Sequence, residues 1–151
     1  MLRAAIAVVM AALGTATPAP AVTNRCAAAA TKAVVRSFVA DYNAGRVAAA
    51  VRLWAPAGRF QWFSTGPPGA RVGSAAYDRA TLGSYLRSRV GVHERLRLTE
   101  LGAGYDSKRG IVDFAGKLVR GADDLRAGKP QDFKGAADCL SGMPRLIVWS
   151  M

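Results

Sequence analysis

Three side chains of this 151-residue chain could take part in acid–base chemistry, and they lie in different segments. His93 is the only histidine, and imidazole is the side chain whose ordinary pKa lies closest to neutrality. Asp113 offers a carboxylate base on a predicted strand, and Tyr42 offers a hydroxyl donor near the end of a predicted helix. These three are weak catalytic candidates, and the sequence leaves open whether any catalysis occurs. His93 is also explained simply as a strand-start residue beside a turn.

The chain carries no pattern that would hold a metal, a cofactor or a nucleic acid. Histidine, cysteine and acidic residues do not cluster at the spacing of metal ligands. There is no Gly-rich phosphate loop, no nucleic-acid motif and no interleaving of aromatic with basic residues. We therefore expect no metal, no cofactor and no nucleic-acid partner.

Residues 1–21 are predicted to be a signal peptide. Arg3 supplies a positive start, Ala4 to Leu13 form an apolar run, and Ala19-Pro20-Ala21 offer the small-x-small pattern of a cleavage site. The apolar run is too short to span a bilayer, which takes about 20 residues. We expect cleavage after Ala21 and export of residues 22–151 as one domain, with no transmembrane segment.

Cys26 and Cys139 are the only cysteines. In an oxidising compartment, a disulfide between them is the simplest expectation. It would tie the start of the mature chain to its penultimate strand, and loop-closure entropy alone predicts a stabilisation of about 4–5 kcal/mol. A reactive thiol is the alternative, but no Cys-x-x-Cys pattern and no evident Cys–His pairing support one.

The chain is strongly basic, with 21 lysines and arginines against 10 acids and a formal net charge of +11. This balance favours anionic partners such as a polymer, a membrane surface or an acidic protein. The basic residues are nevertheless scattered along the chain and form no run. The charge therefore suggests a partner class but locates no site.

Hydrophobic periodicity predicts helices followed by strands. Helical spacing of apolar residues changes to alternation after residue 91. The predicted helices are 27–44, 46–54 and 76–90, and the predicted strands are 58–64, 93–101, 111–120, 131–139 and 145–151. Asp78 is a candidate N-cap of the third helix, and residues 65–74 read as a loop. Grouped helices with sequential strands predict an α+β fold, a curved antiparallel sheet of four to five strands packed against three N-terminal helices.

The aromatic residues have two alternative roles. They could line a ligand cavity between the helices and the sheet, or they could simply fill the core. The candidate pocket residues are Trp54, Phe60, Trp62, Tyr85 and Phe114.

The stretch "FVADYNAGRVAAAVRLWAP", residues 38–56, resembles the opening of nuclear-transport-factor-two-like domains, the SnoaL-like or ketosteroid-isomerase-like group. The third helix and the closing strands are similar to that group as well. The resemblance implies a cone-shaped domain with a pocket between sheet and helices, and often a dimer through the sheet. Enzymatic members carry an acid on or just after the first strand, whereas residues 59–64 here contain none. The group also includes many members that only bind, so the fold does not decide the function.

Three functions remain open. The favoured one is an exported, non-enzymatic domain that binds a small apolar molecule in the cone. The second is an interaction module, whose Arg-rich sheet face, formed by Arg95, Arg97 and Arg120, binds an anionic polymer or a protein. The third is a cofactor-free isomerase, dehydratase or cyclase that uses His93 or Asp113 as a base with a tyrosine as donor. A homodimer is compatible with each.

Overall fold

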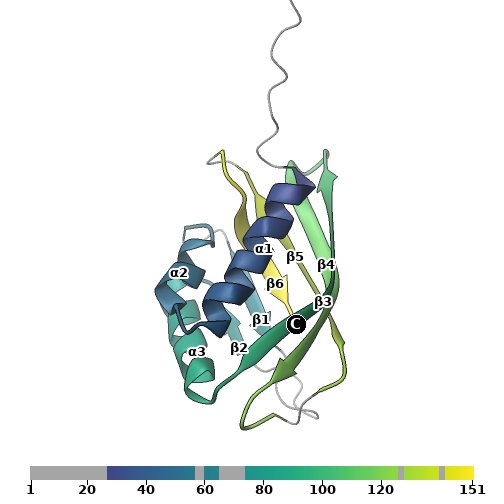
Figure 1. Ribbon diagram of the computed structural model, residues 1–151. Coiled ribbons are helices and arrows are strands. Elements are labelled where there is room, and N and C mark those ends of the chain that lie inside the picture. The colour runs from purple at the N-terminus through teal and green to yellow at the C-terminus, as the bar shows by residue number, and fades with distance from the viewer. Residues whose placement is uncertain (1–26, 57–59, 65–73, 126–127, 140–141) are drawn as a thin grey trace, which may run out of the picture.

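A six-stranded sheet wraps around one long helix, with two shorter helices beside it (Figure 1). The computed structural model describes residues 27–56, 60–64, 74–125, 128–139 and 142–151. The predicted signal peptide and Cys26 lie outside these residues, so the signal peptide and the Cys26–Cys139 disulfide stay predictions. The helices are α1 (Ala28–Asn43), α2 (Val47–Arg52) and α3 (Arg79–Gly91), and the strands are β1 (Gln61–Ser64), β2 (Ser74–Ala76), β3 (Arg95–Asp106), β4 (Ile111–Gly121), β5 (Gln131–Asp138) and β6 (Arg145–Ser150).

The α1 helix crosses the inner face of the sheet (Figure 1). Its buried side chains recur at helical spacing, which places them on one stripe facing the strands: Thr31, Val35, Phe38, Val39 and Tyr42. Gly45 follows the helix with φ of 70°, a left-handed conformation that costs glycine little. The chain can therefore reverse at once into α2.

The α3 helix begins where the sequence predicted its cap. The Asp78 carboxylate accepts hydrogen bonds from the Thr81 backbone nitrogen at 2.7 Å and from the Thr81 hydroxyl at 2.8 Å. This satisfies a backbone donor that a helix start otherwise leaves unpaired. Leu82 and Leu86 are buried, and Tyr85 is partly buried.

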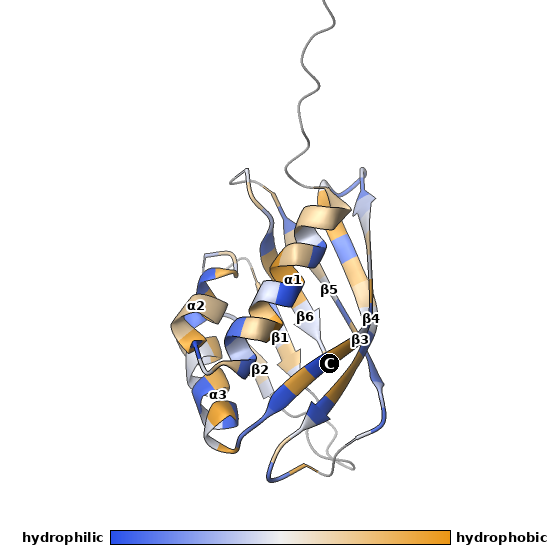
Figure 2. Cartoon of the chain, viewed as in Figure 1, coloured by the Kyte–Doolittle hydropathy of each residue, from blue (hydrophilic) through white to orange (hydrophobic). Residues whose placement is uncertain are grey.

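The predicted α+β class is confirmed, but the sheet has more strands and a different pairing than expected. Its strand order is β2-β1-β6-β5-β4-β3. The last four strands form the predicted antiparallel meander, whereas β1 pairs with β6 in parallel. The short β2 strand falls in residues predicted as the end of a loop and the start of a helix. Figure 2 colours each residue of the helices and the sheet by its hydropathy, from hydrophilic (blue) to hydrophobic (orange).

Two glycines allow the sheet to pack closely on its inner side. A side chain at Gly135 would come within 2.1 Å of the Val148 carbonyl oxygen and 2.3 Å of the Phe114 ring. A side chain at Gly116 would come within 2.1 Å of the Glu100 carbonyl oxygen. Only glycine fits at such close approach.

Candidate functional site

The five predicted pocket aromatics all lie between the helices and the sheet. Trp54, Trp62, Phe60 and Phe114 are buried, and Tyr85 is partly buried. Successive ring centroids are close: 5.0 Å from Trp54 to Phe60, 5.7 Å from Trp54 to Trp62 and 5.7 Å from Trp62 to Tyr85. These rings therefore form part of the hydrophobic core.

Phe38 and Trp149 join the cluster and connect its two sides. Trp62 and Trp149 are register partners across the parallel β1–β6 pair, and their rings stack at 5.8 Å. Phe38 of α1 packs 5.1 Å from the Trp149 ring, and Phe114 packs 5.6 Å from it. Aromatic pairs at such distances are favourable beyond the area they bury. The cluster thus holds α1 against the centre of the sheet.

Several donors inside this aromatic cluster have no acceptor among the described residues. They are the Tyr42 hydroxyl and the indole nitrogens of Trp54, Trp62 and Trp149. All four side chains are almost completely buried. Leaving a buried donor unpaired costs roughly 1–3 kcal/mol. Such donors mark positions where a bound molecule or ordered water would be stabilised.

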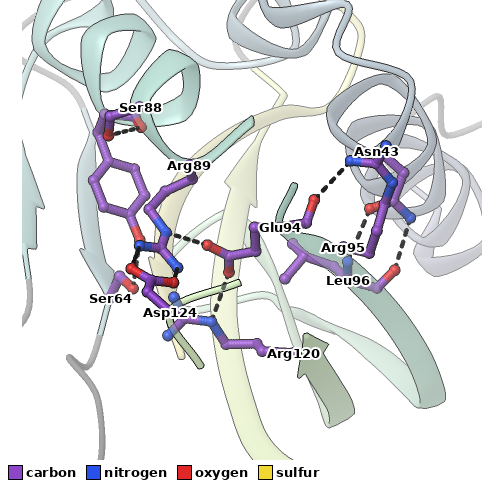
Figure 3. Close-up of polar contacts among 10 residues, drawn as sticks. Asn43, Ser64, Ser88, Arg89, Glu94, Arg95, Leu96, Arg120 and Asp124 are labelled. Carbon is purple, nitrogen blue, oxygen red and sulfur yellow. Dashed lines mark hydrogen bonds and ion pairs between the residues drawn. The ribbon is translucent and has the colours of Figure 1, made fainter. Parts of the chain in front are cut away.

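A charged cluster lies beside these donors, centred on Glu94 (Figure 3). The Glu94 side chain is 0% exposed and accepts a hydrogen bond from Arg89 Nε and another, at 2.8 Å, from Arg120 Nε. The two arginine side chains are only 15% and 8% exposed. A buried carboxylate needs such partners because desolvation of an unpaired charge is costly.

Local backbone geometry brings Glu94 to Arg89. The α3 helix ends at Gly91, and His93 then adopts a φ of 55°, in the left-handed region. This turn lets the Glu94 backbone nitrogen donate to the Arg89 carbonyl at 3.0 Å. Glu94 therefore returns beside the last turn of α3. Arg120 reaches it from β4.

Arg89 also holds a second carboxylate on its other side. Its two terminal nitrogens donate to the two carboxylate oxygens of Asp124, at 2.6 and 2.8 Å. These bonds are the main reason why the pKa of Asp124 is lowered and the pKa of Arg89 is raised. The Asp124 side chain is 49% exposed, in contrast to Glu94. Arg89 thus joins the interior to the surface.

Two tyrosines complete the cluster. Tyr85 donates a hydrogen bond to the Ser64 hydroxyl at 2.7 Å. Burial raises its pKa, and burial followed by the Glu94 charge raises the pKa of Tyr42 well above its ordinary value. Glu94 is thus near Tyr42, although the Tyr42 hydroxyl makes no well-formed hydrogen bond within the described residues. Both phenols remain protonated donors at neutral pH.

The three predicted catalytic residues are not brought together. His93 is 74% exposed and pairs with Asp123, with 2.7 Å between Nδ1 and Oδ2. Asp113 alternates with the inward-facing Val112 and Phe114, so it lies on the outer face, paired with Arg109. Tyr42 lies in the interior. Neither His93 nor Asp113 is therefore placed to act as a base with Tyr42.

Sequence reasoning missed Glu94 and misassigned Arg120, although alternation could have located both. Glu94 lies two residues before the inward-facing Leu96. Because alternate residues of a strand share a face, this spacing predicts an inward side chain for Glu94. Arg120 likewise lies two residues after the buried Leu118 and shares its face of the strand. The predicted basic face is therefore wrong at Arg120, which points inward, while Arg95 and Arg97 are exposed.

The outer face of the sheet carries two adjoining grooves, of about 530 and 570 Å³. Small side chains form much of the floor of the first: Gly102, Gly104, Ala115, Ala136 and Val148. Ala115 and Lys134 line both grooves. Acidic residues balance the basic ones on this face, since Asp132 pairs with Lys117 at 2.8 Å. The face is therefore mixed in charge and not uniformly basic.

Two further features bear on ligands and membranes. Within the part of the chain that the structure describes, no three histidine, cysteine or acidic residues are grouped as metal ligands would be. No cysteine in those ranges is free. None of the described helices combines the length and the apolar character needed to cross a membrane.

Solved structures share this architecture at low sequence identity. A Mycobacterium tuberculosis protein of unknown function aligns with a TM-score of 0.63 at 12% identity, over 81% of this chain and 68% of that one. A Nostoc punctiforme protein of unknown function with a cystatin-like fold aligns with a TM-score of 0.60 at 10% identity, over 79% and 84%. An NTF2-like protein with a cystatin-like fold from Novosphingobium aromaticivorans aligns with a TM-score of 0.58 at 10% identity, over 78% and 75%.

These similarities define the class: the chain has the cystatin-like, NTF2-like fold. No protein-family model and no curated protein sequence matches it. At such low identity the shared fold carries no specific activity to this chain. The function has to be argued from its own residues.

Proposed function

We propose that the chain is a binding domain that holds a small, largely apolar molecule between α1 and the sheet, without catalysis. The observation that carries this proposal is the Tyr42 hydroxyl, which is buried and protonated, lies near Glu94, and makes no well-formed hydrogen bond within the described residues, next to several aromatic rings. Ligand sites in proteins are mostly apolar surfaces with a few placed polar groups. Trp62 and Tyr85 supply such a surface, and Tyr42 and Glu94 supply the polar groups.

The alternative is a cofactor-free enzyme, and the specific observation in its favour is the carboxylate of Glu94 beside Tyr42. That carboxylate, however, accepts a hydrogen bond on each oxygen from an arginine. Each of its oxygens is thus already engaged by a guanidinium group, so a proton taken from a ligand would have to compete with one of these contacts. This is why binding is favoured over catalysis.

The proposal includes export and a Cys26–Cys139 disulfide. The signal-peptide pattern of residues 1–21 and the presence of only two cysteines support both. Expression with residues 1–21 intact, followed by mass spectrometry of the exported protein before and after reduction, tests both. An N-terminus at Val22 and a two-dalton increase on reduction are expected (two hydrogens per disulfide).

A thermal-shift screen of residues 22–151 in oxidised form tests the binding proposal. The panel combines flat aromatic compounds that carry hydrogen-bond acceptors with polyanions, at low and high salt. Stabilisation by an aromatic compound that persists at high salt is expected, because apolar contacts are not screened. Stabilisation by polyanions alone, lost at high salt, would instead support binding through Arg95 and Arg97.

Substitution at Tyr42 shows whether a hit binds at the proposed place. Tyr42→Phe should weaken the hit about tenfold, the value of one hydrogen bond in a buried site. Tyr105→Phe is the matched control, because Tyr105 is exposed on the sheet. Equal affinities for both variants and the parent chain would place the ligand elsewhere.

We also propose that the outer face of the sheet contacts a second copy of the chain. Its floor of small residues permits close approach of another sheet, and its charges are balanced. Glu100 and Lys134 line the second groove without an ion pair within the described residues, so two copies could pair them across the interface. Sedimentation of the Ala115→Arg variant tests this proposal.

A further inference from the structure

The pair formed by Arg89 and Asp124 is asymmetric in a way that points to a ligand. The Arg89 side chain is 15% exposed and belongs to the interior, whereas the Asp124 side chain is 49% exposed and approaches from solvent. The contact is bidentate, with both terminal nitrogens of Arg89 on the two oxygens of one carboxylate. This fork geometry is the one by which arginine recognises carboxylates in general.

The charges of the buried side chains in this cluster do not balance, and one further negative group would neutralise them. Glu94 carries one negative charge, and Arg89 and Arg120 carry two positive charges, so the three buried side chains have a net charge of +1. All acidic residues of the chain lie within the described ranges, and Asp124 is the one that pairs with Arg89 from the surface side (Figure 3). Asp124 thus supplies the compensating charge.

We propose that Asp124 stands in for the carboxylate of the ligand. In the bound state, the ligand carboxylate takes the two terminal nitrogens of Arg89, and Asp124 turns into solvent. The ligand class is therefore an aromatic or otherwise apolar monocarboxylate. This inference rests on the proposed binding function and specifies the head group of the molecule.

The position of the aromatic cluster agrees with this orientation. Tyr85 donates its hydrogen bond to Ser64, which Figure 3 draws next to Arg89, and the Tyr85 ring lies 5.7 Å from the Trp62 ring. A carboxylate on Arg89 would therefore direct an attached ring toward Tyr85 and Trp62. Arg120 and Glu94 keep their own contact when Asp124 leaves.

The local structure allows Asp124 to leave at low cost. It lies on the turn after β4, where the Asp123 backbone nitrogen donates to the Val92 carbonyl at 3.0 Å. The neighbouring Asp123 side chain pairs with the exposed His93. These contacts hold the turn independently of Asp124. Exchange of one carboxylate for another leaves Arg89 with the same type of partner, so Arg89 is not left as an unpaired buried charge.

Binding of a matched pair of probes tests the inference. 2-Naphthoate and 2-naphthamide share a ring system but differ in charge, and their affinities are measured by calorimetry at constant ionic strength. The parent chain should bind naphthoate at least about tenfold more tightly than naphthamide, because charge-assisted hydrogen bonds are the stronger kind. Asp124→Ala should bind naphthoate tighter still, since the internal competitor is gone, and should bind naphthamide unchanged.

Asp123→Ala is the matched control, because it alters the same turn without freeing Arg89. It should bind both probes as the parent chain does. Equal naphthoate affinity in the parent chain and Asp124→Ala would overturn the inference. Binding of both probes with equal affinity in all three proteins would also overturn it, while leaving the proposed apolar site intact.

A second measurement separates the two proposals if neither naphthalene compound binds. The thermal midpoint of Asp124→Ala is followed as sodium acetate replaces sodium chloride. A rise that is absent in the parent chain and in Asp123→Ala supports a carboxylate position at Arg89, and the apolar site is then the part that fails. The lack of any rise, together with the lack of naphthoate binding, overturns the inference.

Discussion

Among single residues, Glu94 carries the most buried charge described in the molecule. Its carboxylate is 0% exposed and balances two largely buried guanidinium groups. Removing one partner of a buried ion pair is much more costly than removing the whole pair, because a desolvated charge is left behind.

Glu94→Gln should therefore destabilise the fold by about 3 kcal/mol or more. The isosteric amide keeps the packing but leaves Arg89 and Arg120 without their shared counter-charge. Urea unfolding followed by tryptophan fluorescence measures the change. Asp123→Asn, on an exposed turn, is the control and should change the stability by less than about 0.5 kcal/mol. A similar small effect for both would mean that the buried cluster relaxes without cost.

Asp124 predicts a pH dependence whose sign follows from its lowered pKa. Hydrogen bonds from Arg89 are the main cause of that lowering. A carboxylate whose pKa is lower in the folded state stabilises the fold above its unfolded-state pKa and loses this contribution as the pH falls through the folded-state pKa.

The stability difference between the parent chain and Asp124→Ala should therefore be constant above about pH 5 and shrink as the pH falls below it. Urea midpoints at pH 7, 5 and 3 measure the difference, with Asp123→Ala as the control for the turn itself. A difference that grows on acidification would contradict the prediction.

At the level of elements, periodicity in the sequence located all three helices and most of the strands. Alternation located β4, β5 and β6, because one face of each strand is buried. The β2 strand was not predictable, since its three residues, Ser-Ala-Ala, have weak strand preference and depend on pairing with β1. The parallel pairing of β1 with β6 joins distant segments, which local patterns do not report.

The candidate site could be predicted only in part for the same reason. The aromatic residues were identified by type and spacing, and the structure places them between helices and sheet. The Glu94 cluster depends on the turn at His93, which returns the chain onto α3. Glu94 and Arg120 nevertheless lie two residues from the inward-facing Leu96 and Leu118, and this alternation was present in the sequence.

The sheet itself yields a prediction at Gly135. Its backbone lies beneath the Phe114 ring, and an added methyl group would come within 2.1 Å of a carbonyl oxygen and 2.3 Å of that ring. Gly135→Ala should therefore destabilise the fold by about 3 kcal/mol, at the upper end of overpacking effects. Gly121→Ala is the matched control at the end of β4, because open space surrounds that position. Equal thermal midpoints for the two variants would show that the sheet adjusts freely.

At the level of the whole molecule, the outer face of the sheet is the surface that determines the oligomeric state we propose. Ala115→Arg places a long charged side chain on the shared floor of both grooves. This variant should sediment as a monomer where the parent chain sediments as a dimer. Ala48→Arg adds the same charge on the exposed side of α2 and should remain dimeric. A monomeric parent chain would rule out this interface.

The position of β6 in the sheet has a consequence for how the chain acquires its structure. β6 is the last strand in the sequence, yet it lies between β1 and β5 and carries Trp149 into the aromatic cluster. β1 and its partner β2 therefore join the rest of the sheet only through β6, whereas α1 also packs on β3. Contacts between such distant segments form slowly. The β3–β6 meander can therefore form first, and β1 and β2 are added beside β6 in a later, slower step.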